Sequence, residues 1–245
     1  MKNFKIVIQY DGTKYNGWQK QGNTRNTIQN VFENILFKYF NKNIEIFASG
    51  RTDAGTHAKY QVANFKLNTN LNTIEMRNLL NKFLPNDISV IDCKEVDIKF
   101  HSRLNAKSKK YVYIIDNGKI KNVFLKNFSF RIEKELNLNS MIEASKLLIG
   151  EHDFRGFCSN KRYKKSTIRN IYNIEFINNN GIIEIVFEAN GFLYNMVRIM
   201  VGTLIEIGLN EKDISCINKI FKNKIREDAG FTAPSKGLTL IDVKY

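Results

Sequence analysis

The sequence is poor in residues that interrupt or cross-link a chain. It has two prolines and three cysteines, and Cys93, Cys158 and Cys216 lie far apart. An odd, dispersed set favours reduced thiols over a disulfide framework. No CxxC or HxxxH spacing occurs, so a metal site is not expected. The scarcity of proline and the lack of a low-complexity tract argue against a long disordered linker.

Long apolar runs are missing too. No run is long enough to span a bilayer, and the opening residues MKNF lack the apolar region of a signal peptide. We therefore expect a cytoplasmic protein. Neither a Walker A motif nor a GxGxxG motif is present, so the sequence predicts no cofactor.

Acidic residues are outnumbered, 24 to 38, which gives a net charge of +14. Such an excess favours a polyanionic partner, most simply nucleic acid. The alternative is compositional, because an AT-rich genome enriches lysine and asparagine without selection for binding. Two clusters are more telling than the total: Lys107, Lys109 and Lys110, and then residues 161–169. The second cluster holds Lys161, Arg162, Lys164, Lys165 and Arg169 around Tyr163, an aromatic ring suited to stacking on a base.

The hydrophobic pattern predicts an α+β fold. Alternation and helical periodicity predict, in order, a strand at 4–10, a helix from 27 to 40, strands at 44–49 and 60–67, a helix at 73–83 and a strand at 88–96. This βαββαβ order is ferredoxin-like.

The order then repeats. The predicted elements are a strand at 110–116, a helix at 139–149 ended by Gly150, a hairpin of 167–177 and 182–189, helices at 193–207 and 213–222, and a strand at 237–243. We expect an N-terminal half of residues 1–105 and a C-terminal half of residues 106–245, both ferredoxin-like. Joined edge to edge, they would form one mostly antiparallel sheet with helices on one face and a central basic cleft.

One loop, GRTDAGTH at 50–57, carries an acid, a base and an imidazole between two predicted strands. Glycine at both ends allows a sharp turn and the close approach of a ligand. One interpretation is a polar loop whose Asp53 hydrogen-bonds its own backbone. The other is a carboxylate kept ionised beside Arg51 and presented as a nucleophile.

Six blocks in a fixed order decide how this loop is interpreted. They are YDGTKYNGWQKQ at 10–21, GRTDAGTHA at 50–58, LPNDISV at 84–90, FHSRLNAKSKKYVY at 100–113, GFLYNMVRIMVGTL at 191–204 and FTAPSKGLTL at 231–240. Together they resemble the pseudouridine synthases of the TruA family, over nearly the whole chain. Two positions depart from that pattern, since Thr56 and Tyr60 stand where valine and glycine are expected.

The resemblance implies an activity and a site. It implies isomerisation of uridine to pseudouridine at positions 38, 39 and 40 in the anticodon stem-loop of tRNA, by a homodimer that needs no cofactor or metal. It implies Asp53 as the nucleophile, Arg198 as the cation paired with it and Tyr111 as a contact to the target base. Arg51 is a candidate to fill the space of the flipped base or to hold a phosphate, and His57 is a candidate for RNA contact or for a hydrogen bond within the loop.

Reasoning from the residues alone leaves alternatives open. Arg198 lies in a mostly apolar helix, where an unpaired charge is costly, but it could also face solvent. Tyr111 and Tyr113 share a strand face, and tyrosines there are commonly core residues. A silent RNA-binding protein and a nucleoside glycosidase are the competing functions. The intact Asp53 motif argues against the first, and the lack of a second obvious carboxylate argues against the second.

Overall fold

The computed structural model describes residues 1–160 and 165–245, and the contacts divide the chain into two compact units. Unit 1 comprises Met1–Lys107 and Thr239–Tyr245, and unit 2 comprises Ser108–Leu238. Four members of the second basic cluster, Lys161, Arg162, Tyr163 and Lys164, lie outside the described residues. The architecture is α+β, as expected, with strands paired mostly antiparallel. In the part of the chain described here, no helix has the length and apolar character needed to cross a membrane.

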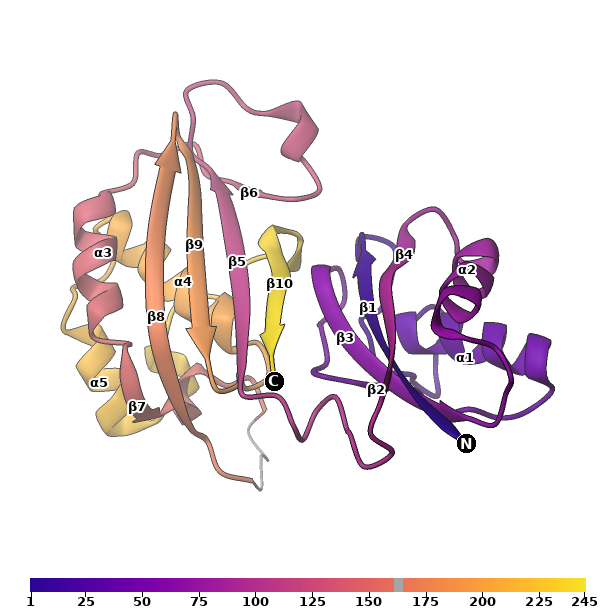
Figure 1. The fold of residues 1–245 in the computed structure, drawn as a ribbon. Helices are drawn as coiled ribbons and strands as arrows, with labels where there is room; N and C mark the ends of the chain where they lie inside the picture. The colour runs from indigo at the N-terminus through magenta and orange to yellow at the C-terminus, as the bar shows by residue number, and fades with distance from the viewer. Residues whose placement is uncertain (161–164) are drawn as a thin grey trace. The chain divides into compact units, whose positions relative to one another are not determined.

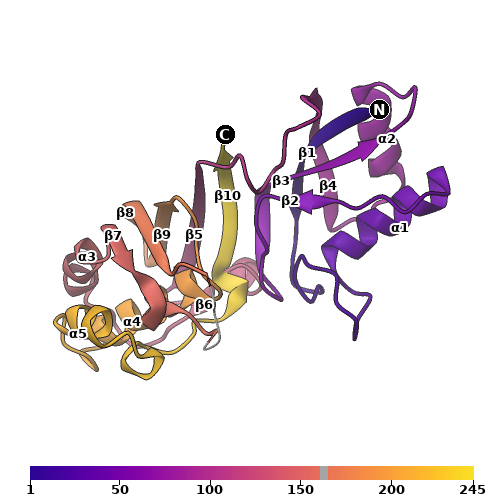
Figure 2. The same ribbon diagram turned by 90° about the horizontal axis from the view of Figure 1, so that it is seen from below.

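Unit 1 is a sheet with two helices on one face (Figures 1 and 2). Its elements are β1 (Lys2–Tyr10), α1 (Ile28–Phe40), β2 (Phe47–Ala48), β3 (His57–Leu67), α2 (Thr73–Phe83), β4 (Ile88–Val96) and β10 (Leu238–Lys244). β1 lies between β4 and β3 and is antiparallel to both. β3 pairs along its other edge with β2, antiparallel, and with β10, in parallel.

The core of unit 1 is aromatic. Phe4 of β1 stacks on Phe65 of β3 with ring centroids 5.5 Å apart. Trp18, only 2% exposed, packs between Tyr10 and Phe32, which joins the loop after β1 to helix α1. Helix α1 begins as predicted, because the Thr27 side chain accepts a hydrogen bond from the backbone N–H of Asn30.

Unit 2 has the same two-layer design. Its elements are β5 (Ser108–Asp116), η1 (Val123–Leu125), β6 (Phe130–Arg131), α3 (Leu138–Lys146), β7 (Gly150–Asp153), η2 (Phe154–Phe157), β8 (Ile168–Asn179), β9 (Ile182–Ala189), α4 (Met196–Gly208), α5 (Cys216–Asn223), η3 (Arg226–Asp228) and η4 (Ser235–Gly237). The strands follow the order β5-β9-β8-β7, with β6 parallel to β5 on its outer edge. Figure 2 shows α3, α4 and α5 on one face of this sheet.

The predicted hairpin of β8 and β9 is confirmed. Asn180 and Gly181 form its two-residue turn with φ of 53° and 85°. Both angles lie in the left-handed region that the mirror-image hairpin turn requires, and asparagine and glycine adopt it at low cost.

Several predicted elements differ in extent. The strand expected at 44–49 is only Phe47–Ala48. The helix expected to reach Ile149 ends at Lys146, and Gly150 begins β7, where it pairs with Ile171 of β8. Helix α4 begins at Met196 instead of Leu193, because Asn195 adopts a left-handed φ of 60° that no helix residue can have. The ferredoxin-like character of the two halves and the basic cleft stay predictions.

Candidate active site

The Asp53 loop occupies residues 49–56, between β2 and β3 of unit 1. Asp53 itself is half-buried, and Arg51 is exposed. The loop is held by backbone hydrogen bonds to the segment that follows β1. The N–H of Trp18 donates to the carbonyl of Thr52 at 3.1 Å, and the N–H of Gly55 donates to the carbonyl of Tyr15 at 3.1 Å. These bonds fix the peptide groups on both sides of Asp53.

Two glycines make this close approach possible. A Cβ atom at Gly12 would lie 2.0 Å from the carbonyl oxygen of Thr56, and one at Gly17 would lie 2.6 Å from that of Thr52. Gly17 also has a φ of 87°, in the region that other residues rarely adopt. The sequence emphasised the glycines of the loop itself, and Gly55 does have a positive φ of 75°. The need for Gly12 and Gly17 was missed because it depends on contacts between two separate segments.

A network of buried polar side chains forms hydrogen bonds to the loop. The hydroxyls of Tyr10 and Thr52 share a hydrogen bond of 2.8 Å, and Gln61 donates to the carbonyl of Gly50 at 2.9 Å. Ser49 donates to the side-chain oxygen of Gln61 at 2.7 Å. Burial raises the pKa of Tyr10 to about 12, against the opposing effect of its bonds to Thr52 and Gln61. Tyr10 therefore stays neutral and acts as a structural support.

His57 closes the other end of the loop. It is 2% exposed, and its Nδ1 accepts a hydrogen bond from the N–H of Gly12 at 3.0 Å. The same nitrogen lies 3.1 Å from the carboxylate of Asp11. The burial favours the hydrogen-bonding alternative for His57 over direct RNA contact.

Arg51 and Thr56 flank Asp53 in different ways. The Nε of Arg51 donates to the side-chain oxygen of Gln19 at 2.8 Å, so its exposed guanidinium is tethered to the block after β1. Thr56, where valine was expected, is 1% exposed, and its hydroxyl has no hydrogen-bond partner among the described residues. Tyr60, the second departure, is 36% exposed on β3.

The other two candidates lie in unit 2. Tyr111 is 7% exposed on β5, and its ring meets that of Phe192 edge-on with centroids 5.3 Å apart. Tyr113 lies further along the strand, fully buried, and its hydroxyl donates to the carbonyl of Pro234 at 2.8 Å. Burial raises the pKa of Tyr113, and the charge of Arg198 opposes that shift.

Arg198, in the first turn of α4, is half-buried. Its Nε donates to the carbonyl of Ala233 at 2.7 Å, and its Nη1 donates to the side-chain oxygen of Asn195 at 2.9 Å. This anchoring is not that of a side chain free in solvent. The structure thus groups Arg51, Asp53 and His57 in unit 1, and Tyr111 and Arg198 around Tyr113 in unit 2. Among the described residues, no three histidine, cysteine or acidic side chains are grouped to hold a metal ion.

Comparison with known proteins identifies the family. A model described as tRNA pseudouridine synthase matches residues 6–105 and 144–245, which include Asp53 and Arg198 but not Tyr111. The chain belongs to the tRNA pseudouridine synthase family. Members of this family are isomerases, since pseudouridine has the same atoms as uridine.

Relatives resemble the chain over its whole length. A tRNA pseudouridine synthase A of Bacillus sp. (strain KSM-64) is 47% identical over all of both chains. A tRNA pseudouridine synthase A of Thermoanaerobacter sp. (strain X514) is 44% identical, and a tRNA pseudouridine synthase A 2 of Bacillus cereus (strain ZK / E33L) is 43% identical, again with full coverage of both chains. A crystal structure of a Cbf5-Nop10-Gar1 complex has a TM-score of 0.42 and 12% identity, with 97% of this chain and 48% of the other covered.

Proposed function

We propose that this chain isomerises uridine to pseudouridine at positions 38, 39 and 40 in the anticodon stem-loop of tRNA, with Asp53 as the nucleophile. Membership of the family supports the reaction, and full-length identity to proteins named tRNA pseudouridine synthase A supports the substrate. The single observation that carries the role of Asp53 is its loop, which backbone bonds from Trp18 and Gly55 hold in one conformation. A nucleophile fixed in this way loses little entropy when it reacts.

The reaction needs only a rearrangement of bonds. Asp53 attacks the nucleotide, the N1–C1′ bond breaks, and the uracil turns within the site. The C5–C1′ bond then forms, and the bond to Asp53 breaks, which releases the carboxylate. The proton on C5 leaves while N1 gains one, so that no atom or electron is added. An internal rearrangement of this kind requires no cofactor.

Each remaining candidate has a role in this proposal. The target base must leave the stack, and the exposed guanidinium of Arg51 fills its place or holds a phosphate. Tyr111 stacks on the flipped uracil, and its hydroxyl accepts or relays the proton from C5. Arg198 pairs with Asp53 and keeps that carboxylate ionised. His57 supports the loop through its bond to Gly12.

The enzyme is proposed to act in the cytoplasm as a homodimer that binds tRNA across both subunits. The family resemblance supports this assembly. Sedimentation of the protein alone and with one to two equivalents of tRNA tests it, since a particle of one chain in both samples would contradict the dimer.

A nucleoside analysis separates the proposed function from its competitors. Bulk tRNA lacking pseudouridine is treated with the protein and digested to nucleosides. Pseudouridine supports the synthase, free uracil would indicate a glycosidase, and unchanged tRNA would indicate a silent binder. Asp53→Asn is the matched control, because the amide keeps the shape of the side chain but cannot act as the nucleophile. It should bind tRNA and form no pseudouridine, with deamidation excluded by mass spectrometry.

A further inference from the structure

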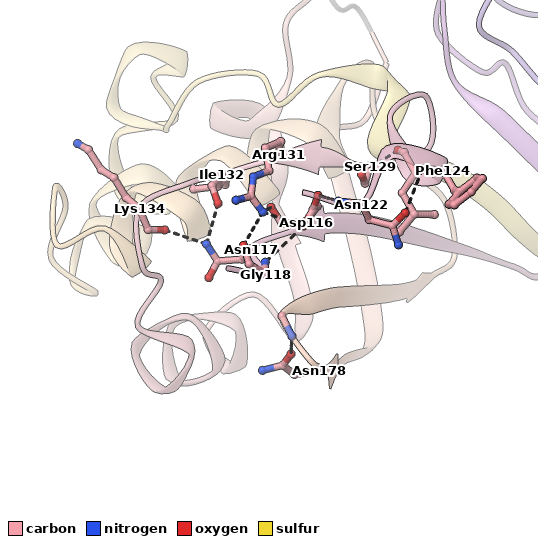
Figure 3. A network of polar contacts seen from close by, with 12 residues as sticks. Asp116, Asn117, Gly118, Asn122, Phe124, Ser129, Arg131, Ile132, Lys134 and Asn178 are labelled. Atoms are coloured by element: carbon pink, nitrogen blue, oxygen red, sulfur yellow. Dashed lines mark hydrogen bonds and ion pairs between the residues drawn. The ribbon is translucent and has the colours of Figure 1, made fainter. Parts of the chain in front are cut away.

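A loop of unit 2 between β5 and β6, residues 117–129, lies outside the residues that the family model matches. We call it the β5–β6 loop. It is built on a buried carboxylate, as Figure 3 shows. Asp116, 2% exposed, accepts hydrogen bonds from the N–H of Asn122 at 2.9 Å and from the guanidinium of Arg131 at 2.9 Å. The beginning, the middle and the end of the loop are thereby tied to one side chain.

Further bonds fix the conformation of the loop between these ends. The guanidinium of Arg131 also donates to the carbonyl of Gly118 at 2.6 Å, and the Asn122 side chain accepts from the N–H of Phe124 at 3.0 Å. Ser129 donates to the carbonyl of Leu125 at 2.9 Å. Because so many backbone groups are bonded, the loop holds its tip in a defined position.

The tip of this ordered loop is apolar and exposed. Phe124 is 88% exposed, Ile120 is 86% exposed and Val123 is 56% exposed. Figure 3 shows the ring of Phe124 directed away from the Asp116 network. Single exposed apolar side chains are common on protein surfaces, but three on one short, well-bonded loop favour a binding role.

The charge of the loop indicates which partner fits. Lys119, Lys121 and Lys126 are all exposed, and residues 117–132 contain no acidic residue. An aromatic ring among ammonium groups matches a nucleic acid with unpaired bases, because the ring stacks on a base and the cations neutralise phosphates. An acid-free loop on a chain of net charge +14 is less suited to contact a second copy of the same protein.

We propose that the β5–β6 loop is an RNA-contacting arm in which Phe124 stacks on an unpaired base of the tRNA and Lys119, Lys121 and Lys126 contact neighbouring phosphates. This inference rests on the proposed function, which supplies tRNA as the ligand. The arm adds binding to the substrate at a place that takes no part in bond making.

The test compares tRNA binding by Phe124→Ala, Phe124→Trp and a matched control. Phe124→Ala should raise the Kd for tRNA by roughly tenfold or more, as expected for the loss of one stacked base. Phe124→Trp should bind as the unmodified protein does, and the fluorescence of the new indole should be quenched when tRNA is added. Phe83→Ala, which removes a 45% exposed ring on α2, should leave the Kd unchanged.

The role of the three lysines is tested by the dependence of the Kd for tRNA on salt concentration. Replacing Lys119, Lys121 and Lys126 together by Gln should make log Kd depend less steeply on log salt concentration, by about two units of slope for three phosphate contacts. Sedimentation of each variant must give the mass of the unmodified protein.

Two results would contradict the proposal that the β5–β6 loop contacts RNA. An unchanged Kd for Phe124→Ala, or an indole at position 124 whose emission does not respond to tRNA, would contradict stacking. A lower mass for Phe124→Ala would instead mark the loop as a contact between protein chains, and would also overturn the proposal. Failure of the proposed function looks different, because the unmodified protein would then form no pseudouridine, whatever the variants do.

Discussion

Thr52 and Thr56 flank Asp53 and differ in what their hydroxyls meet. The Thr52 hydroxyl bonds that of Tyr10, whereas the buried hydroxyl of Thr56 has no partner among the described residues. Replacing Thr56 by Val removes an unsatisfied polar group of nearly the same volume, so we expect the free energy of unfolding to rise by about 1 kcal/mol. Thr52→Val is the matched control and should lower it by about 1 kcal/mol. Urea denaturation measures both, and a loss of stability in Thr56→Val would contradict the account.

Tyr111 and Tyr113 form a second matched pair. Tyr113→Phe removes the bond to Pro234, which should cost about 1 kcal/mol of stability and leave activity nearly unchanged. Tyr111→Phe keeps the ring but deletes the oxygen that we propose relays a proton. Single-turnover pseudouridine formation should then fall by roughly a hundredfold, with tRNA binding preserved. Small, equal effects on the rate at both positions would leave Tyr111 as a packing residue.

At the scale of elements, the contact between the Asp53 loop and the segment after β1 depends on glycine. Gly17→Ala adds a Cβ 2.6 Å from the Thr52 carbonyl, at a residue with positive φ, so we expect a loss of about 1–3 kcal/mol in stability and a slower reaction from a displaced loop. Gly22→Ala is the control, because nothing lies within 4 Å of its Cβ position. Thermal unfolding and turnover of both variants test the prediction. Equal behaviour of the two would show that the loop does not need the close approach.

Asp116 links the β5–β6 loop to the stability of unit 2. Burial alone would raise its pKa, but the N–H groups of Asn122 and Gly118 and the Arg131 guanidinium outweigh burial and hold the pKa below its usual range. The folded pKa is therefore lower than the unfolded value of about 3.9. The stabilisation is fully present above that value and is lost as the pH falls through the folded pKa.

The variant Asp116→Asn isolates this contribution. It should be less stable than the unmodified protein at pH 7, by about 1–3 kcal/mol, and the difference should shrink as the pH falls below about 4. Urea denaturation across pH 3 to 7 measures it. A difference that is constant over this range would show that the charge of Asp116 does not contribute.

The elements that local signals define could be predicted from the sequence. Helix α2 spans Thr73–Phe83 as expected, because Asn72 and Glu75 form a capping box at its start and Pro85 follows its end. Strand β7 could not be predicted, because Leu147, Leu148 and Ile149 continue the apolar pattern of α3, and only pairing with β8 makes the next residues a strand. The loop of Asp53 was found from its own residues, but its supports Gly12, Gly17 and Gln61 act across the fold, and no local pattern marks them.

For the whole molecule, the prediction concerns charge. If the net charge of +14 serves tRNA binding, the affinity should fall steeply with salt, because each phosphate contact releases a counterion. Six to ten such contacts would weaken binding by about 10³–10⁵ between 50 and 200 mM salt. Filter binding at several salt concentrations measures the slope. A flat response would mean that the charge reflects composition alone.

Because β10 is the last strand of the chain and pairs with β3, the sheet of unit 1 cannot form fully until the C-terminal residues have been synthesised. Thr239 and Leu240 lie beside His57 and Ala58, directly after the Asp53 loop, yet all of unit 2 separates the two strands in the chain. At ribosomal speeds of about 5–20 residues per second, the part of this β3 edge at His57 and Ala58 stays unpaired for on the order of ten seconds or more. Unit 1 is therefore the first to be synthesised and the last to be finished. A nascent chain halted before residue 239 would expose an unpaired strand edge next to Asp53.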